Sequence, residues 1–332
     1  MSGSPLRRGV PIVAGCFAAL AVAVLTAPLI GSTPISLVRA FDRTLPFADN
    51  VDAQIFFIAR LPRALAAALV GATLAAAGVV FQGLLRNPLA TPYTLGVSAG
   101  ASLGAMVAIT FDLSLPIGGV APAALTGASL AVLVVYWLAT MRHRGFSTTV
   151  LLLAGVTLNA FFSALILFVQ YIGDFAQTYR ALRWLMGDLD VAGYRPILTA
   201  LPLVIVALGV FAWLARPLNL LSMGADAAAT RGVNVERAQR AAFFGASLAT
   251  GAAVSVGGPI GFIGIIVPHF VRLLVGSDHR LVLPASIGLG AAFLVACDAV
   301  ARIALSPVEL PVGIVTAVIG GPFFLWLLVR KR

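Results

Sequence analysis

Long apolar runs, separated by short polar segments, follow one another along the whole chain. Ten runs are found, at approximately 10–30, 62–84, 93–110, 117–140, 148–172, 196–215, 238–256, 260–276, 281–304 and 311–329. Most reach the roughly 20 residues that a helix needs to cross a bilayer core about 30 Å thick. They are continuous, whereas transmembrane strands alternate with a period of two. The pattern predicts an all-α polytopic membrane protein with ten transmembrane helices, forming one transmembrane domain over residues 1–332.

The third and eighth runs differ from the others because they are short and rich in glycine and proline. Their interrupted stretches, near 87–98 and 257–268, occupy similar places in the two halves of the chain. Because the two stretches are five spans apart, an odd number, any repeat that relates them has opposite orientations in the membrane. Broken apolar segments at matching positions are typical of such architectures, so the sequence predicts an inverted repeat.

The amino-acid composition excludes several classes of soluble protein. Of the 332 residues, 60% are hydrophobic and 10% are charged, whereas soluble domains carry roughly 45–50% apolar and about 25% charged residues. These values exclude an ordinary soluble enzyme, a disordered chain and a nucleic-acid binder, despite a net charge of +10. Both cysteines, Cys16 and Cys297, fall inside predicted spans, so neither a disulfide framework nor a metal site is expected.

The charges indicate the orientation. With both termini on one side, that side receives 14 of the 22 Lys and Arg residues but only three of the 12 acids. The opposite side receives the remaining eight Arg and nine acids. Because an excess of Lys and Arg marks cytoplasmic loops, we expect both termini in the cytoplasm.

Ionisable residues lie mainly at loop ends. Asp298 and Arg302, four residues apart near the outer end of the ninth span, could pair as helix neighbours. The lack of an acid near the bilayer centre disfavours a proton-coupled carrier. A stand-alone secondary transporter of a small organic solute remains the alternative, since carbonyls and hydroxyls can form a sodium site.

The fifth span carries a line of polar side chains. Asn159, Ser163 and Gln170 follow one another at spacings of four and seven, which places them on one helical face. They could hydrogen-bond to neighbouring helices, or they could form one wall of a wet pathway. A non-transporting receptor or scaffold would need no such face.

The loop at 218–240 reads LNLLSMGADAAATRGVNVERAQR. Small residues followed by Gly232 predict a short helix that ends in a left-handed turn. Asp226-Ala227-Ala228-x-x-x-Gly232 resembles the Glu-Ala-Ala-x-x-x-Gly signature of bacterial ABC importer permeases, with Asp in place of Glu. In that family the segment is the coupling helix that docks on the cytoplasmic ATPase.

Four further segments carry the same resemblance. They read RLPR at 60–63, QGLLRNPLATPYTLGVSAG at 82–100, GGPIGFIGIIVPHFVRLLVGSDHR at 257–280 and ELPVGIVTAVIGGP at 309–322. Together they resemble the ABC importer permeases that take up iron–siderophore complexes, haem and cobalamin. The similarity runs from about residue 55 to the C-terminus, and that family also has ten spans per subunit.

The resemblance implies a homodimer in the bacterial inner membrane, with two cytoplasmic ABC ATPase subunits and an extracytoplasmic substrate-binding protein. The chain has no G-x-x-x-x-G-K-[ST] pattern, and its single lysine is Lys331. ATP and Mg would therefore be bound by the partner subunit, and no enzyme activity, cofactor or metal is expected in this chain. Substrate would move by alternating access. The stretch TPYTLGVSAGASLGA favours a ferric siderophore, with haem or cobalamin as alternatives.

The resemblance also assigns roles to individual residues. Those expected to dock the binding protein are Arg60, Arg63 and Arg302, although interfacial snorkelling of Arg60 and Arg63 is an alternative. Those expected to couple to the ATPase are Asp226, Ala227, Ala228 and Gly232. The expected cytoplasmic gate comprises Asn87, Leu89, Ser147, Thr148 and Thr149. The expected translocation pathway comprises Asn159, Ser163 and Gln170, and the vestibule Arg180 and Arg183. We expect His269 to pack or to contact the ATPase rather than to bind a ligand.

Overall fold

The computed structural model describes residues 5–42, 44–113, 119–141, 148–191 and 193–330. Helices dominate this part of the chain, and its one β-bridge is isolated, between Leu305 and Val308. The longer α-helices are α1 (Pro5–Thr26), α4 (Leu61–Leu85), α5 (Val97–Thr110), α6 (Val120–Met141), α7 (Thr148–Ile172), α8 (Phe175–Leu185), α9 (Arg195–Leu221), α11 (Val235–Gly257), α12 (Ile263–Val275), α13 (His279–Ile303) and α14 (Val312–Arg330). The short elements are η1 (Ala27–Leu29), α2 (Leu37–Ala40), α3 (Val51–Gln54), η2 (Ile55–Arg60), η3 (Pro92–Leu95) and α10 (Ala225–Ala229).

A helix lies at each of the ten expected spans, but the helices are not equally long and apolar. By length and composition, six described stretches could cross a membrane, namely Gly9–Leu29, Val51–Leu85, Val120–Met141, Thr149–Ile172, Arg195–Leu221 and His279–Ile303. The apolar parts of α5, α12 and α14 are shorter, and α11 begins with the polar sequence VERAQR. The all-helical, membrane-type architecture is confirmed, whereas the count of ten crossings stays a prediction.

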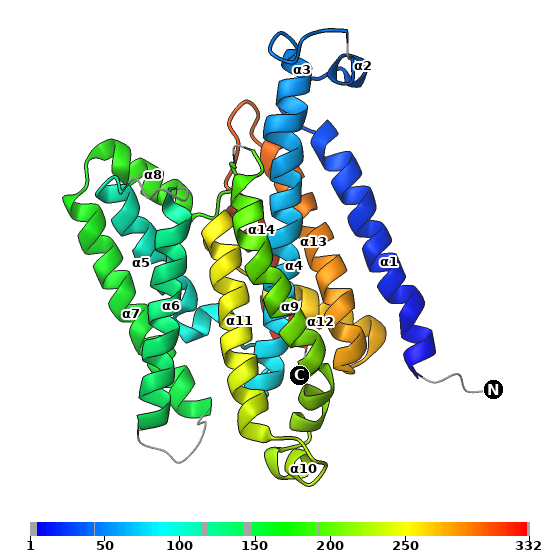
Figure 1. Ribbon diagram of the computed structural model, residues 1–332, viewed down its shortest axis with the longest axis vertical. Helices are drawn as coiled ribbons and strands as arrows, with labels where there is room; N and C mark the ends of the chain where they lie inside the picture. Colours follow the sequence, from blue (N-terminus) through cyan, green and yellow to red (C-terminus); the bar gives the residue numbers. More distant parts are fainter. Residues whose placement is uncertain (1–4, 43, 114–118, 142–147, 192, 331–332) are drawn as a thin grey trace.

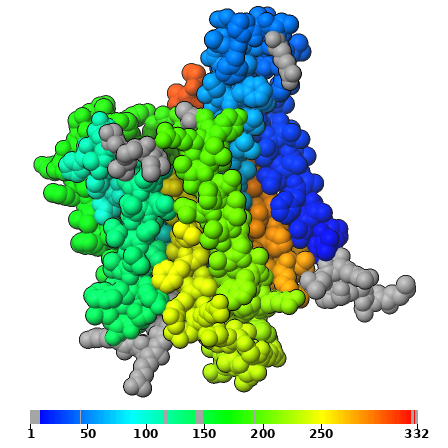
Figure 2. All heavy atoms as spheres, in the orientation of Figure 1, coloured from blue at the N-terminus to red at the C-terminus, as the bar shows by residue number. Residues whose placement is uncertain are grey.

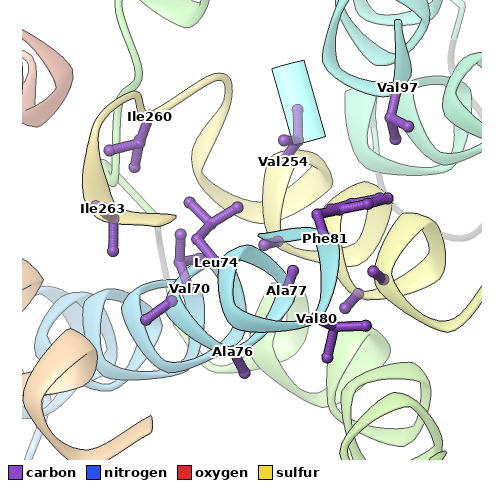
Figure 3. Packing of buried hydrophobic residues seen from close by; sticks show 14 of the residues in the cluster. Val70, Leu74, Ala76, Ala77, Val80, Phe81, Val97, Val254, Ile260 and Ile263 are labelled. Atoms are coloured by element: carbon purple, nitrogen blue, oxygen red, sulfur yellow. The ribbon is translucent and has the colours of Figure 1, made fainter. Parts of the chain in front are cut away.

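Helix α4 lies at the centre of the molecule. It packs against α9, α11, α12 and α13 (Figure 1), and most of its side chains are buried. Figure 3 shows Leu74 and Phe81 of α4 among side chains of the neighbouring segments, including Ile260 and Ile263. A helix that is apolar all round is suited to a position inside a bundle.

Glycines allow α4 to approach its neighbours backbone to backbone. A Cβ added at Gly71 would lie 2.3 Å from the carbonyl oxygen of Gly290 on α13. One added at Gly78 would lie 2.2 Å from that of Gly264 on α12. Close packing through small residues is how helices associate in a bilayer, where lipid removes most of the hydrophobic driving force.

A second group of helices, α5, α6 and α7, lies beside this bundle and contacts it mainly through α11 (Figure 1). Helix α8 lies across one end of the group, and it begins with a capping box between Asp174 and Gln177. On the other side of the molecule, α1 packs against α13.

The interrupted stretches of the two halves contact each other. Helix α4 ends at Leu85, and η3 precedes α5. From η3, the Tyr93 hydroxyl donates a hydrogen bond to the carbonyl oxygen of Ile260. Gln82 Nε2 donates to the carbonyl oxygen of Gly264 at 2.8 Å. The inverted repeat itself stays a prediction.

The two ends of the molecule carry different segments. In Figure 2 the segments with α2 and α3 protrude at the top, whereas the α10 region protrudes at the bottom. Helix α8 lies toward the α2–α3 end (Figure 1). Residues expected to face the binding protein and residues expected to face the ATPase therefore lie at opposite ends.

Candidate functional site

The polar face of α7 forms one wall of a cavity. The cavity has a volume of about 560 Å³ and opens to the surface of the molecule. Its lining comes from η3, α5, α7 and α8 and comprises Tyr93, Ser98, Ala99, Ser102, Asn159, Ser163, Ile166, Leu167, Gln170, Leu182 and Leu185. The structure thus brings all three expected pathway residues into one cavity.

The polar face of α7 could either hydrogen-bond to neighbouring helices or line a wet pathway, and different residues of this face fit each interpretation. Asn159 Nδ2 donates to the carbonyl oxygen of Tyr93 at 2.6 Å and so links α7 to η3. Gln170 Nε2 lies 3.9 Å from Met106 Sδ on α5. Ser163, between them, is exposed and has no hydrogen-bond partner among the described residues. Asn159 and Gln170 therefore join helices, while Ser163 leaves its hydroxyl free in the cavity.

Sequence reasoning missed Ser98 and Ser102, which face the same cavity from α5. Their spacing of four residues could have revealed them, because it places both hydroxyls on one helical face. With these serines the cavity has hydroxyl and amide groups on two walls and leucines on others. None of its lining side chains is charged at neutral pH. Such a surface can contact a large solute without holding it through ion pairs.

A second cavity, of about 490 Å³, lies beside the first. Arg183 lines it and pairs with Asp188 and, at 3.5 Å, with Asp190. Leu182 lines both cavities, so α8 separates them. Of the two arginines expected in the vestibule, Arg183 is thus held by acids, whereas Arg180 is exposed and lines neither cavity.

The arginines expected to dock a partner meet in a buried cluster. Arg63 of α4 donates to Asp298 of α13 at 2.8 Å and also pairs with Glu309 in the loop before α14. Arg302 lies 3.2 Å from the same Asp298 carboxylate, which confirms the helix-neighbour pair. Asp298 is fully buried, while the Glu309 side chain is 38% exposed.

Backbone carbonyls complete this cluster. Arg302 donates to the carbonyl oxygens of Ile30 and Ala27 at 2.8 and 3.0 Å. Arg60 donates to Pro28 at 3.3 Å and to Thr33. Because Arg60 and Arg63 are each only 7% exposed, the snorkelling interpretation is wrong. Docking of a partner protein stays a prediction.

The loop between α9 and α11 has the expected local structure. Asp226, Ala227 and Ala228 lie in α10, and Gly232 follows with a φ of +82°. The Val233 amide donates back to the Ala228 carbonyl at 3.1 Å, which is a glycine-based helix ending. The prediction of a short helix ending in a left-handed turn is confirmed. Coupling to an ATPase stays a prediction.

The turn after α4 is held by its own side chains. Arg86 adopts a left-handed φ of +48°, and Asn87 Oδ1 accepts a hydrogen bond from the Leu89 amide at 2.9 Å. Leu89 is 43% exposed. Of the other expected gate residues, Ser147 lies outside the described residues, Thr148 is described only as the first residue of α7, and Thr149 is exposed. The gate stays a prediction.

His269 packs edge-on against Phe323, with ring centroids 6.3 Å apart. The described residues contain no group of three side chains that could hold a metal ion.

Comparison with known proteins gives consistent matches over almost the whole chain. The model of the FecCD transport family matches residues 19–330. The chain is 45% identical to the cobalamin import system permease protein BtuC of Halobacterium salinarum, over 88% of this chain and 78% of that protein. It is 39% identical to the hemin transport system permease protein HmuU of Yersinia pestis, over 91% and 92%. It also superposes on a metal-chelate type ABC transporter solved in an inward-facing conformation, with a TM-score of 0.85, 32% identity and coverage of 97% and 99%.

Proposed function

The chain belongs to the FecCD transport family, and on this premise we propose that it is the permease through which an ATP-driven importer moves a ferric siderophore. The coarser description, a permease subunit of the ABC importers for metal chelates, vitamin B12 and haem, follows from its relatives. The energy comes from separate ATPase subunits.

The observation that carries the proposal is the cavity beside α7. Polar side chains from α5 and α7 line it together with leucines, and no fixed charge holds a ligand in place. A transport site must bind its substrate weakly enough to release it. We assign the pathway to Asn159, Ser163 and Gln170, with Ser98 and Ser102 on the facing helix.

The assembly we propose is a homodimer with two ATPases and a binding protein. The cavity opens to the surface of the molecule, and large apolar residues such as Phe161 and Phe168 are exposed on α7. These features support a second copy that completes the pathway. On the opposite end from the Arg63 cluster, α10 would transmit ATPase closure, and the turn at Asn87 and Leu89 would open and close the exit.

Docking of the binding protein would use the outer surface of the Arg63 cluster. Asp298 is enclosed, but the half-exposed Glu309 carboxylate can be replaced on Arg63 by a carboxylate of the partner. Glu309→Gln should therefore tighten binding-protein affinity severalfold in surface plasmon resonance, because the competing charge is removed. Asp49→Asn, an exposed acid at the same end, is the matched control. Weaker binding by Glu309→Gln would reject this docking surface.

The substrate is tested by ATPase activity of the assembled complex. Binding protein loaded with a ferric siderophore should stimulate ATP hydrolysis more than the same protein offered haem or cobalamin. Stimulation by cobalamin or haem alone would show that the permease is correctly assigned and that the substrate is not.

A further inference from the structure

A cavity separate from the one beside α7 lies toward the α10 end of the molecule, where α4, α9, α12 and α13 meet. Its volume is about 270 Å³. Its lining comprises Gln82, Gly83, Arg86, Asn87, Pro88, Ser222, Arg272, Ser277 and His279. Two arginines line this cavity, and no acid does.

Arg272 lacks a counter-charge. It is half-buried, and its described side-chain partner is the neutral Gln82, whose Oε1 accepts from Arg272 Nη1. It forms no ion pair with any described residue. Taking a guanidinium out of water is costly unless an anion compensates it. The fold therefore leaves a positive charge unpaired inside this cavity.

Arg86 adds a second unpaired cation to the cavity. It adopts a left-handed backbone conformation, with a φ of +48°, which is uncommon for a residue with a side chain. No hydrogen bond or ion pair holds its side chain in the part of the chain that the structure describes. Its guanidinium is thus free to turn toward a ligand.

Asp278, the acid between the lining residues Ser277 and His279 in the sequence, is occupied elsewhere. Asp278 pairs with Arg280 at 2.6 Å and accepts from Asn219 Nδ2 at 2.7 Å. The hydrogen bond from the Arg280 side chain keeps the pKa of Asp278 well below its usual range. Asp278 is therefore a charged carboxylate committed to Arg280, and it does not compensate Arg272.

The wall of the cavity also contains an unpartnered polar atom. His279 is 6% exposed, and its Nδ1 lies 2.7 Å from Asn219 Oδ1. Since that oxygen can only accept, Nδ1 carries the proton. Nε2 is then a buried acceptor without a partner, and it faces Gly83, whose added Cβ would lie 3.0 Å away. Buried polar atoms in folded proteins normally have a partner; this acceptor needs a donor, such as a hydroxyl of hydrogen phosphate or of a glycerol headgroup, rather than a phosphate oxygen.

We propose that this cavity binds a phosphate group, held between the guanidinium groups of Arg86 and Arg272. Guanidinium matches phosphate geometry through two parallel hydrogen bonds, and Ser277 and Asn87 offer neutral donors beside them. The group comes from a lipid headgroup or from free phosphate. Leu273 and Leu274, next to Arg272 on α12, are 70% and 49% exposed and could contact acyl chains. Basic pockets between helices at the cytoplasmic side of a membrane favour anionic headgroups. This proposal does not depend on which substrate is transported, but it shares Asn87 with the proposed exit gate and its lipid source rests on the proposed cytoplasmic position of this end.

The test uses the purified full chain in detergent and counts bound molecules by native mass spectrometry. The probes are dihexanoyl phosphatidylglycerol, dihexanoyl phosphatidylcholine and inorganic phosphate. We expect phosphatidylglycerol to bind the wild type, and Arg86→Gln and Arg272→Gln to weaken it about tenfold or more. Arg216→Gln removes the same charge from an exposed site outside the cavity and should change nothing. Because Arg86 is exposed, Arg86→Gln remains informative even if Arg272→Gln fails to fold.

Competition between the probes distinguishes a lipid headgroup from free phosphate as the source of the bound phosphate group. Displacement of phosphatidylglycerol by millimolar inorganic phosphate supports the site and identifies free phosphate as a competent ligand. Resistance to phosphate identifies the headgroup. Binding of neither probe, or equal loss of binding in Arg86→Gln and Arg216→Gln, overturns the proposal.

Discussion

Asp298 is the residue on which the Arg63 cluster depends. Its enclosed carboxylate faces both Arg63 and Arg302, so its removal leaves two buried cations without their main counter-charge. We expect Asp298→Asn to lower the free energy of unfolding by about 3–5 kcal/mol. Glu309→Gln, at a half-exposed partner of the same Arg63, should cost about 1 kcal/mol or less. Thermal unfolding of the detergent-purified variants measures both.

If Asp298→Asn and Glu309→Gln lowered the free energy of unfolding by similar amounts, burial would not determine the contribution of each ion pair to stability. Of the contacts in this cluster, the sequence predicted only the pair between Asp298 and Arg302. The spacing of four between Asp298 and Arg302 predicts their pairing, whereas the partner of Arg63 lies 235 residues away. Because that contact depends on how α4 and α13 pack, no local pattern could predict it.

At the scale of the helices, Gly78 sets the distance between α4 and α12. An added Cβ would lie 2.2 Å from the Gly264 carbonyl oxygen, so Gly78→Ala must push the helices apart and should lower the unfolding temperature. On α9, Gly209 has no neighbour within 4 Å of the same added atom. Gly209→Ala should be neutral or stabilising, by up to about 1 kcal/mol. An unchanged or raised unfolding temperature for Gly78→Ala would contradict backbone contact here.

The α10 segment gives a second prediction at this scale. Gly232 has a φ of +82° with open space around it, and a β-branched residue is strained there. Gly232→Val should disrupt the end of α10 and reduce co-purification of the ATPase subunits severalfold.

Gly193→Val is the matched control, because Gly193 has a φ of +75°, similar open space and a position between α8 and α9. It should impose similar strain without affecting ATPase association. Equal loss in both variants would indicate a general folding defect. Full retention in Gly232→Val would remove α10 from the coupling role.

Viewed as a whole molecule, the order and approximate bounds of the helices follow from the apolar runs. All ten expected spans coincide with helices, and the spacing of Asn159, Ser163 and Gln170 placed them correctly on one face. The serines on α5, the separation of the two cavities by α8 and the meeting of the interrupted stretches at Tyr93 and Ile260 were not predicted. These features depend on contacts between distant segments, which periodicity within one helix does not encode.

The most direct test of the central claim is ATP-dependent accumulation of a ferric siderophore in proteoliposomes that contain this chain, its ATPase and its binding protein. Ser163→Trp fills the cavity from α7, and Thr126→Trp adds the same side chain at an exposed site on α6 outside it. Wild type and Thr126→Trp should accumulate the chelate only when ATP and the ATPase are present. Ser163→Trp should lose accumulation by about tenfold or more while still binding the ATPase, since blocking the pathway raises the barrier to passage. Transport by Ser163→Trp at the wild-type rate, or accumulation without the ATPase, would contradict the account.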